Sequence, residues 1–279
     1  MAGTPTVNDG RAVPKRRRRP SSLAIFGTIR VRDYVALAGL AFLVVLGVWM
    51  LIRLLNLVDA RFLPWPGDVV GKLGSLASDG TLWGDISVSV TRIAVGFGLA
   101  TVLAVPIGIL IGVYRFAEAL VEPMVDFVRY MPVVGFVALT IIWIGIGDSQ
   151  KWSIVFIGTF FQEVLLVMDN VKRVPKELVD IGQTLGLRDV GILRRIILRA
   201  AAPAIWDTLR ISLGWAWTWI VLAELVAANT GLGYRIQAAQ RFFNTPTIIG
   251  YLIVLGLLGL ITDQVMKAMG RWMFRWAER

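Results

Sequence analysis

The chain has 279 residues, of which 56% are hydrophobic and 17% charged, with a mean hydropathy of +0.69. Soluble domains of this length rarely reach that hydropathy, so the composition argues against a soluble enzyme. The chain has no cysteine and no histidine, which excludes thiol nucleophiles, disulfides, imidazole bases and Cys/His metal sites. We interpret the formal net charge of +10 as a sign of membrane topology rather than of nucleic-acid binding.

Residues 1–33 are polar and basic, with a run from Lys15 to Arg19, and we predict a disordered cytoplasmic tail. The first transmembrane helix is expected at 34–55, since residues 34–52 carry no charge and about 20 apolar residues span the hydrocarbon core. No small-residue cleavage site follows this apolar stretch. The pattern therefore favours an uncleaved anchor over a signal peptide.

Segment 56–89 contains FLPWPGDVV, in which two prolines force extended backbone. We predict an external elbow followed by a short interfacial helix, with Trp65 and Trp83 at the water–lipid boundary. The main membrane domain is expected over 90–268 and a cytoplasmic C-terminal tail over 269–279. Within that domain the apolar pattern predicts spans at 90–114, 128–147, 152–170, 204–227 and 247–268.

The distribution of lysine and arginine predicts which side each loop occupies. With the N-terminus inside, the internal segments hold 20 Lys and Arg residues and the external segments hold 6. This excess agrees with the positive-inside rule. We therefore predict a multi-pass protein of the bacterial cytoplasmic membrane, with about six spans and both termini in the cytoplasm.

The internal segment 169–203 predicts a short amphipathic helix. Pro175 suits the start of a helix, Glu177 is favoured near the positive end of its dipole, and Gly186 suits the left-handed position that ends it. Asp189 could cap a second helix, and Pro203 could open the next span. The first helix carries one apolar stripe, which either lies on lipid headgroups or is gripped by a cytoplasmic partner: Leu178, Ile181 and Leu185.

Polar side chains inside spans are candidates for a solute path, because a charge that faces lipid costs about 3 kcal/mol or more. Glu163 is expected to face the interior, with Arg210 as a candidate partner, whereas Glu224 and Asp263 near span ends are interpreted as interfacial or structural. Three tryptophans at alternate positions must point in different directions on a helix. The candidate path residues are Gln162, Glu163, Arg210, Trp215, Trp217 and Trp219.

Small residues favour close packing of membrane helices. Gly108 and Gly112 form a GxxxG pattern, and Gly256 and Gly259 also lie close together in the sequence. The only segment that approaches a phosphate loop is Gly67–Leu73, which lacks the required spacing and the metal-binding hydroxyl. We therefore expect no ATPase site and no bound cofactor in this chain.

The internal segment resembles a motif of the permeases of binding-protein-dependent ABC importers. That motif reads Glu-Ala-Ala, three residues, Gly, nine residues, Ile-x-Leu-Pro. Here Asp180-Ile181-Gly182, Gly186 and Ile196-Ile197-Leu198 match it in spacing, with Asp for Glu, Ile-Gly for Ala-Ala and Arg199 for Pro. The nitrate/sulfonate/taurine-type branch is similar in five segments: FLPWPGDVV, WIGIGDSQK, PKELVDIGQTLGL, AELVAANTGLGYRI and GLLGLITD.

The resemblance implies an all-α type I ABC importer transmembrane fold. It implies a coupling helix at about 175–187 that docks on a cytoplasmic ABC ATPase dimer, which carries the ATP and Mg. It further implies an extracytoplasmic solute-binding protein and a second permease copy, most simply a homodimer. The coupling residues that it assigns are Pro175, Glu177, Leu178, Asp180, Ile181, Gly182, Thr184, Leu185, Gly186 and Leu187.

The resemblance favours a small oxyanion as solute: a nitrate, a sulfonate or taurine. A glutamate with nearby indoles instead suits a small organic cation, such as a guanidinium or amine compound, through charge pairing and cation–π attraction. A stand-alone channel or secondary transporter is a lesser alternative. A membrane-embedded enzyme is disfavoured, because the intramembrane acids are scattered and no histidine or cysteine accompanies them.

Overall fold

The computed structural model describes residues 30–277. The predicted tail 1–33, with its basic run from Lys15 to Arg19, lies almost wholly outside the described residues. The chain divides into two units at Val58 and Asp59. In the first unit, helix α1 (Val31–Leu54) forms where the sequence predicts the first span.

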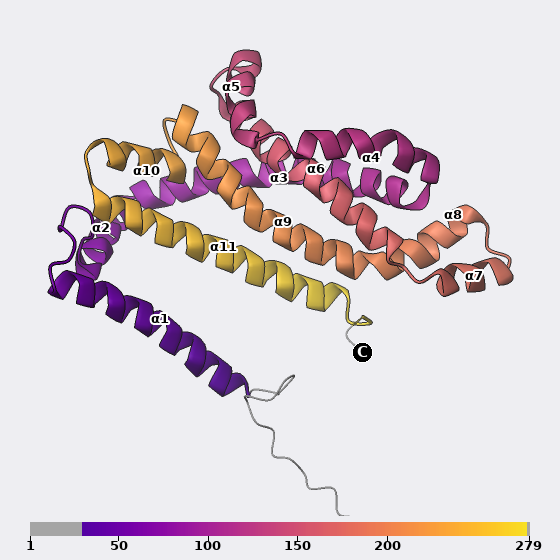
Figure 1. Cartoon of the computed structure of the whole chain (residues 1–279), viewed down its shortest axis with the longest axis horizontal. Coiled ribbons are helices and arrows are strands. Elements are labelled where there is room, and N and C mark those ends of the chain that lie inside the picture. Colours follow the sequence, from indigo (N-terminus) through magenta and orange to yellow (C-terminus); the bar gives the residue numbers. More distant parts are fainter. Residues whose placement is uncertain (1–29, 278–279) are drawn as a thin grey trace, which may run out of the picture. The chain divides into compact units, whose positions relative to one another are not determined.

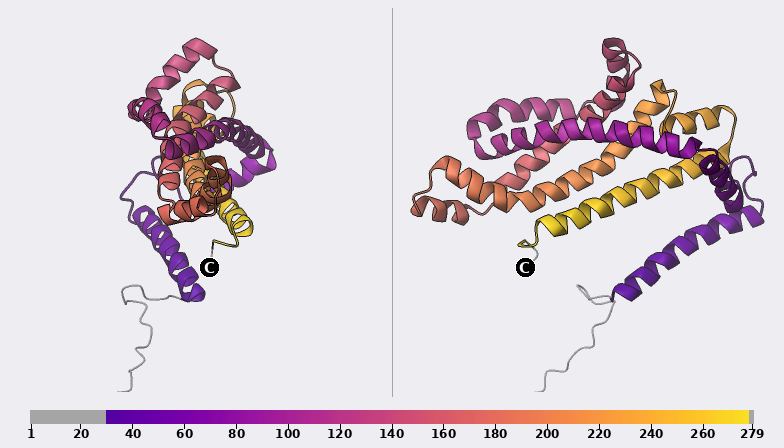
Figure 2. Two further views of the ribbon diagram at one scale, coloured as in Figure 1. Left: turned by 90° about the vertical axis from the view of Figure 1, so that its right-hand side faces the viewer. Right: turned by 180° about the vertical axis from the view of Figure 1, so that it is seen from behind.

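The second unit is also built from helices, and no strand occurs between residues 59 and 277. Figure 1 shows α3, α6, α9 and α11 running along one another in this unit, with α7 and α8 at one end and α2 and α10 at the opposite end, and Figure 2 shows the same arrangement from behind. We call these the inner end and the outer end, after the predicted orientation. Its elements are α2 (Pro66–Ser78), α3 (Thr81–Val113), α4 (Arg115–Arg129), α5 (Val133–Ile144), α6 (Asp148–Lys172), α7 (Lys176–Thr184), α8 (Asp189–Ile192), the π-helical turn η1 (Leu193–Ile197), α9 (Leu198–Ala227), α10 (Leu232–Arg241) and α11 (Thr245–Met273).

Two predicted spans differ from the structure. The sequence predicts one continuous span over 128–147, but α4 and α5 meet there at an angle of 95°. Pro132 explains the break, because proline disfavours helical backbone in the residue before it. The span expected to open at Pro203 instead begins at Asp189 and continues through η1, with Pro203 inside α9. Over the described residues, five helices can cross a membrane, or six if the bent pair counts as one span.

The closest helix contact in the second unit is between α3 and α6, which run parallel. Small residues recur every four positions along α3 and meet α6. A Cβ atom on Gly108 would lie 2.6 Å from the carbonyl oxygen of Val164, and one on Gly112 would lie 2.7 Å from the Cβ of Val171. The predicted GxxxG packing is confirmed here. The pair Gly256 and Gly259 shows no such close packing, since a Cβ on Gly256 would meet no described atom within 4 Å.

A buried ion pair holds the outer ends of α3 and α9 together. Arg92 of α3 lies 2.8 Å from Glu224 of α9, and neither side chain is more than 7% exposed. Glu224 also accepts hydrogen bonds from the Ser89 hydroxyl and from the backbone N–H of Gly233 at the start of α10. The guanidinium of Arg92 reaches Asp148 at 2.7 Å, which adds the start of α6. The interpretation of Glu224 as structural therefore fits its contacts.

Asp85 forms a second centre at the outer end. Its carboxylate accepts hydrogen bonds from the Tyr251 hydroxyl of α11 at 2.8 Å, from Arg235 of α10 at 2.9 Å and from the backbone N–H of Gly231. The hydrogen bond to Asp85 raises the pKa of Arg235 above its ordinary value. Buried polar groups in a membrane domain require such partners, so this network fixes α10 and α11 against α3.

We expect Gly108→Ala to destabilise the protein, although alanine is the better helix former. The added methyl meets backbone at 2.6 Å, so α3 and α6 must separate, and overpacking of this kind costs about 1–3 kcal/mol. The thermal unfolding midpoint in detergent measures the effect. Gly98→Ala is the matched control on the same helix, since its Cβ would meet nothing within 4 Å; equal midpoints for the two variants would contradict the packing described here.

We expect Arg92→Met to lower the unfolding midpoint strongly, because it leaves the fully buried Glu224 without its cation. Breaking one partner of a buried ion pair typically costs about 3–5 kcal/mol. The double variant Arg92→Met/Glu224→Gln should lose less than the sum of its two single variants. A thermal-shift double-mutant cycle tests this, and strict additivity would mean that the pair does not act as a unit.

Candidate translocation path and coupling surface

Glu163 lies between three helices and not on an open face. Its side chain is fully buried, and its carboxylate accepts hydrogen bonds from Ser212 of α9 at 2.6 Å and from Thr101 of α3 at 3.2 Å. The predicted partner is wrong: Arg210 pairs with Asp263 at 3.2 Å and not with Glu163. Glu163 therefore has the surroundings of a core residue that ties α3, α6 and α9 together.

A cavity of about 280 Å³, which we call the bend cavity, opens where α4 turns into α5. It brings together two predicted path residues, Gln162 of α6 and Trp219 of α9, with Arg129 at the end of α4. Its remaining lining comes mainly from the bend and from α6: Val128, Tyr130, Met131, Pro132, Val133, Phe136, Ile157, Gly158 and Phe161. No acidic side chain is among the described residues that line this cavity.

The bend cavity offers hydrogen-bond donors and one positive charge. Arg129 is held by Asp126 at 2.9 Å and donates to the Tyr130 hydroxyl at 3.0 Å. Trp219 packs over Gly158, where a side chain would collide with the indole, and its buried Nε1 has no hydrogen-bond acceptor among the described residues. That nitrogen is buried, so the donors open to a solute are those of Arg129 and of the exposed Gln162 amide, which also carries an acceptor oxygen. A guanidinium and an amide can both donate to the oxygens of an anion.

The other predicted path residues lie elsewhere. Trp217 is buried and donates from Nε1 to the Thr262 hydroxyl of α11 at 3.1 Å, while Trp215 is half-buried and does not line the bend cavity. The three tryptophans thus point in different directions, as the helix period requires. Arg210 lines a different cavity with Trp206 and Lys267. Only Gln162 and Trp219 of the six candidates meet at one cavity.

The predicted amphipathic helix is α7, and its boundaries follow the sequence signals. Pro175 precedes the first helical residue, and Glu177 lies in the first turn. Gly186 has φ of +75°, the left-handed conformation that ends a helix, and Leu187 donates to the Gly182 carbonyl at 3.0 Å. Gly182 is buried against Ile196 of η1. Helix α7 is therefore a short, well-bounded element packed on the inner end.

One face of α7 is apolar and unburied. The exposed fraction of the side chains rises along it, from 40% at Leu178 through 56% at Ile181 to 75% at Leu185. Asp180 and Thr184 lie next to this stripe, and the Thr184 hydroxyl donates to the Asp180 carbonyl at 2.9 Å. An exposed apolar stripe on a short helix with polar neighbours is suited to docking on another protein.

The segment nearest to a phosphate loop, Gly67–Leu73, lies inside helix α2. A phosphate loop needs consecutive backbone N–H groups that are free to bind oxygens. Within α2 most of these groups are bonded along the helix. This geometry gives no support to an ATP site at that segment.

The sequence allows Arg129, like Arg210, to serve an anion path, but it gives no sign of the Asp85 centre. The signal for Arg129 is its position before Tyr130-Met131-Pro132, where a proline inside an apolar run predicts a break rather than a straight span. A charged side chain beside such a break can face a cavity. Asp85 gives no comparable signal, because its partners come from α10 and α11.

Comparison with known proteins agrees with this architecture. Residues 104–275 match the family model of the binding-protein-dependent transport system inner membrane component. A probable ABC transporter permease protein of Brucella abortus is 40% identical over 240 residues, which cover 86% of this chain and 95% of the relative. The taurine transport system permease protein TauC of Escherichia coli is 31% identical and covers 84% and 86%, respectively.

A more distant relative and a solved structure complete the comparison. The bicarbonate transport system permease protein CmpB of Synechococcus elongatus is 27% identical over 70% of each chain. A chain of the inward-facing MetNI methionine ABC transporter aligns with a TM-score of 0.61 at 19% identity, covering 68% of this chain and 95% of that one. This likeness shows the type I importer fold. The chain belongs to the inner-membrane permease family of binding-protein-dependent ABC importers, as a transport subunit.

Proposed function

We propose that this permease forms the alternating-access path for a small oxyanion of the nitrate, sulfonate or taurine type. The observation that carries the proposal is the bend cavity, where the guanidinium of Arg129 and the exposed amide of Gln162 face the same space. The same cavity has no carboxylate among the described residues that line it. Selective passage of an anion needs this kind of lining, because bare carboxylates would repel it.

The relatives support the same class of solute. Taurine is named for TauC, and bicarbonate for CmpB. Both are small polar anionic or zwitterionic solutes with a resonance-stabilised oxyanion group. The alternative, a guanidinium or amine compound, depended on Glu163 facing the path. The enclosure of Glu163 by Thr101 and Ser212 supports the oxyanion over this cation.

The proposed energy source is a separate cytoplasmic ATPase dimer that holds the ATP and Mg, docked on α7 of each of two permease copies. ATP-driven closure of the ATPases would move the two α7 helices and tilt the packed spans, so that the path opens alternately to each side. An extracytoplasmic solute-binding protein would deliver the solute at the outer end. Both termini would lie in the cytoplasm, as the basic residues predict.

We expect Arg129→Gln to lower oxyanion uptake at least tenfold in proteoliposomes that contain the permease, its ATPase and its binding protein. The reason is the loss of the one cation that lines the bend cavity in the described chain. Arg129→Lys should retain part of the rate, since it keeps the charge but not the planar fork.

Arg210→Gln is the matched control, because Arg210 pairs with Asp263 away from that cavity. Uptake of taurine, an alkanesulfonate, nitrate and a guanidinium compound is compared across the variants. Normal oxyanion uptake by Arg129→Gln, or guanidinium uptake that falls with Glu163→Gln, would refute the oxyanion path.

We expect Leu185→Glu to weaken association of the ATPase while the permease still folds. Leu185 is 75% exposed, so a polar side chain costs little in the free permease. Burial of a leucine at an interface contributes about 1.5–3 kcal/mol, which corresponds to roughly 10- to 150-fold in affinity. Co-purification and solute-stimulated ATPase activity measure the loss. Trp276→Glu, another exposed apolar side chain near the C-terminus, is the control; unaffected docking with Leu185→Glu would remove α7 from the interface.

A further inference from the structure

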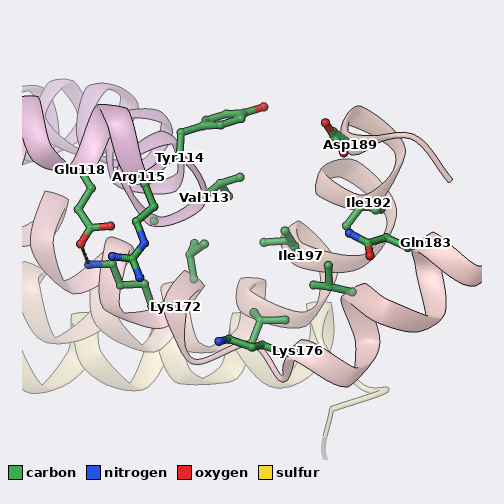
Figure 3. Close-up of a pocket in the computed structure, with 14 residues that line it drawn as sticks. Val113, Tyr114, Arg115, Glu118, Lys172, Lys176, Gln183, Asp189, Ile192 and Ile197 are labelled. Atoms are coloured by element: carbon green, nitrogen blue, oxygen red, sulfur yellow. Dashed lines mark ion pairs between the residues drawn. The ribbon is translucent and has the colours of Figure 1, made fainter.

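A cavity of about 570 Å³ lies at the inner end, behind α7 (Figure 3). We call it the inner cavity. It is bounded by the end of α3, the start of α4, the end of α6, and by α7, α8 and η1. Its lining mixes charged and aliphatic side chains: Gly112, Val113, Tyr114, Arg115, Glu118, Val171, Lys172, Val174, Lys176, Val179, Gln183, Asp189, Ile192 and Ile197.

Helix α7 presents two different faces, and only one of them lines the inner cavity. A helix turns about 100° per residue, so Lys176, Val179 and Gln183 share one face. Leu178, Ile181 and Leu185 share the nearly opposite face, which is exposed. A molecule in the inner cavity would therefore contact the back of α7 without covering its apolar stripe.

The charges in the inner cavity leave an excess of one cation. Glu118 lies 3.0 Å from Lys172, so these two charges compensate each other. Arg115 and Lys176 have no acidic partner within 4.0 Å in the described chain. Figure 3 shows Arg115, Glu118 and Lys172 at one side of the cavity and Asp189 at the other. A ligand with a single negative charge would neutralise the site.

The inner cavity also lies at the ends of two apolar helices, where lipid headgroups are expected. The apolar helix α3 ends at Val113 and α6 ends at Lys172, and both ends border the cavity. Apolar side chains, among them Val171, Val174, Ile192 and Ile197, form the rest of its wall. A phospholipid combines the two required chemistries, since its phosphodiester bears one negative charge and its acyl chains are apolar.

We propose that the inner cavity binds an anionic phospholipid of the inner leaflet, with Arg115 and Lys176 on its phosphodiester. The bound lipid lies between α7 and the ends of α3 and α6. It thereby fixes the position of the helix that receives the ATPase. This regulatory consequence rests on the proposed role of α7, whereas the lipid site itself does not.

The test uses the purified complex of the full-length permease with its ATPase in detergent, titrated with dioctanoyl phosphatidylglycerol. Native mass spectrometry counts retained lipid, and the unfolding midpoint reports its stabilisation. We expect the double variant Arg115→Gln/Lys176→Gln to bind this lipid about 30-fold more weakly, at about 1 kcal/mol for each basic residue. Arg199→Gln is the matched control, an exposed basic residue of α9 that does not line the cavity, and it should bind normally.

Two other ligands distinguish the possible sources of the phosphate group. Dioctanoyl phosphatidylcholine and inorganic phosphate should both stabilise the complex far less than phosphatidylglycerol. Equal stabilisation by inorganic phosphate would show a soluble-anion site and overturn the lipid proposal, as would unchanged phosphatidylglycerol binding by the double variant. In nanodiscs, transport-coupled ATPase activity should rise with phosphatidylglycerol in the wild type and not in the double variant. If the lipid binds but coupling does not respond, the lipid site stands and the assigned role of α7 fails.

Discussion

The parallel contact of α3 with α6 decides what the rest of the membrane domain can do. Glycine at 108 and 112 lets the two backbones approach until a Cβ would collide, which leaves α6 little freedom to rotate. In the orientation that α6 adopts, Glu163 points toward Thr101 and Ser212 in the core. In the same orientation, the neighbouring Gln162 lines the bend cavity. Helix packing therefore gives the adjacent residues Gln162 and Glu163 opposite surroundings, one at a cavity and one in the core.

The two ends of the domain are held together by different kinds of contact. The outer end is held by buried, charge-assisted contacts in which Arg92, Glu224 and Asp85 join five helices: α3, α6, α9, α10 and α11. The inner end has a short helix with an exposed apolar stripe and a mixed cavity behind it. In the proposed mechanism, movement of α7 would be carried by α6 and α9 as rigid helices.

Most of the fold could be predicted from the sequence because long apolar runs and basic loops are local signals. Helix α7 could also be predicted, from Pro175, Gly186 and its stripe. The residues of a solute path could not be predicted, because the direction in which a side chain faces depends on which helices pack against each other. A mid-span carboxylate such as Glu163 has the same sequence signal whether it faces a pore or a hydroxyl on a neighbouring helix. The predicted spans do not show the bend at Pro132 either, because the apolar residues on both sides of it have the pattern of one continuous span.

The facing of α6 can be measured directly, because the sequence contains no cysteine and every single-cysteine variant reports only its own position. Gln162→Cys and Glu163→Cys are introduced separately and treated with a membrane-impermeant thiol reagent in the assembled transporter. We expect position 162 to react, taurine or a sulfonate to slow that reaction, and position 163 to stay unmodified. Rapid modification at 163 with none at 162 would contradict the assigned packing of α3 and α6 and, with it, the oxyanion path.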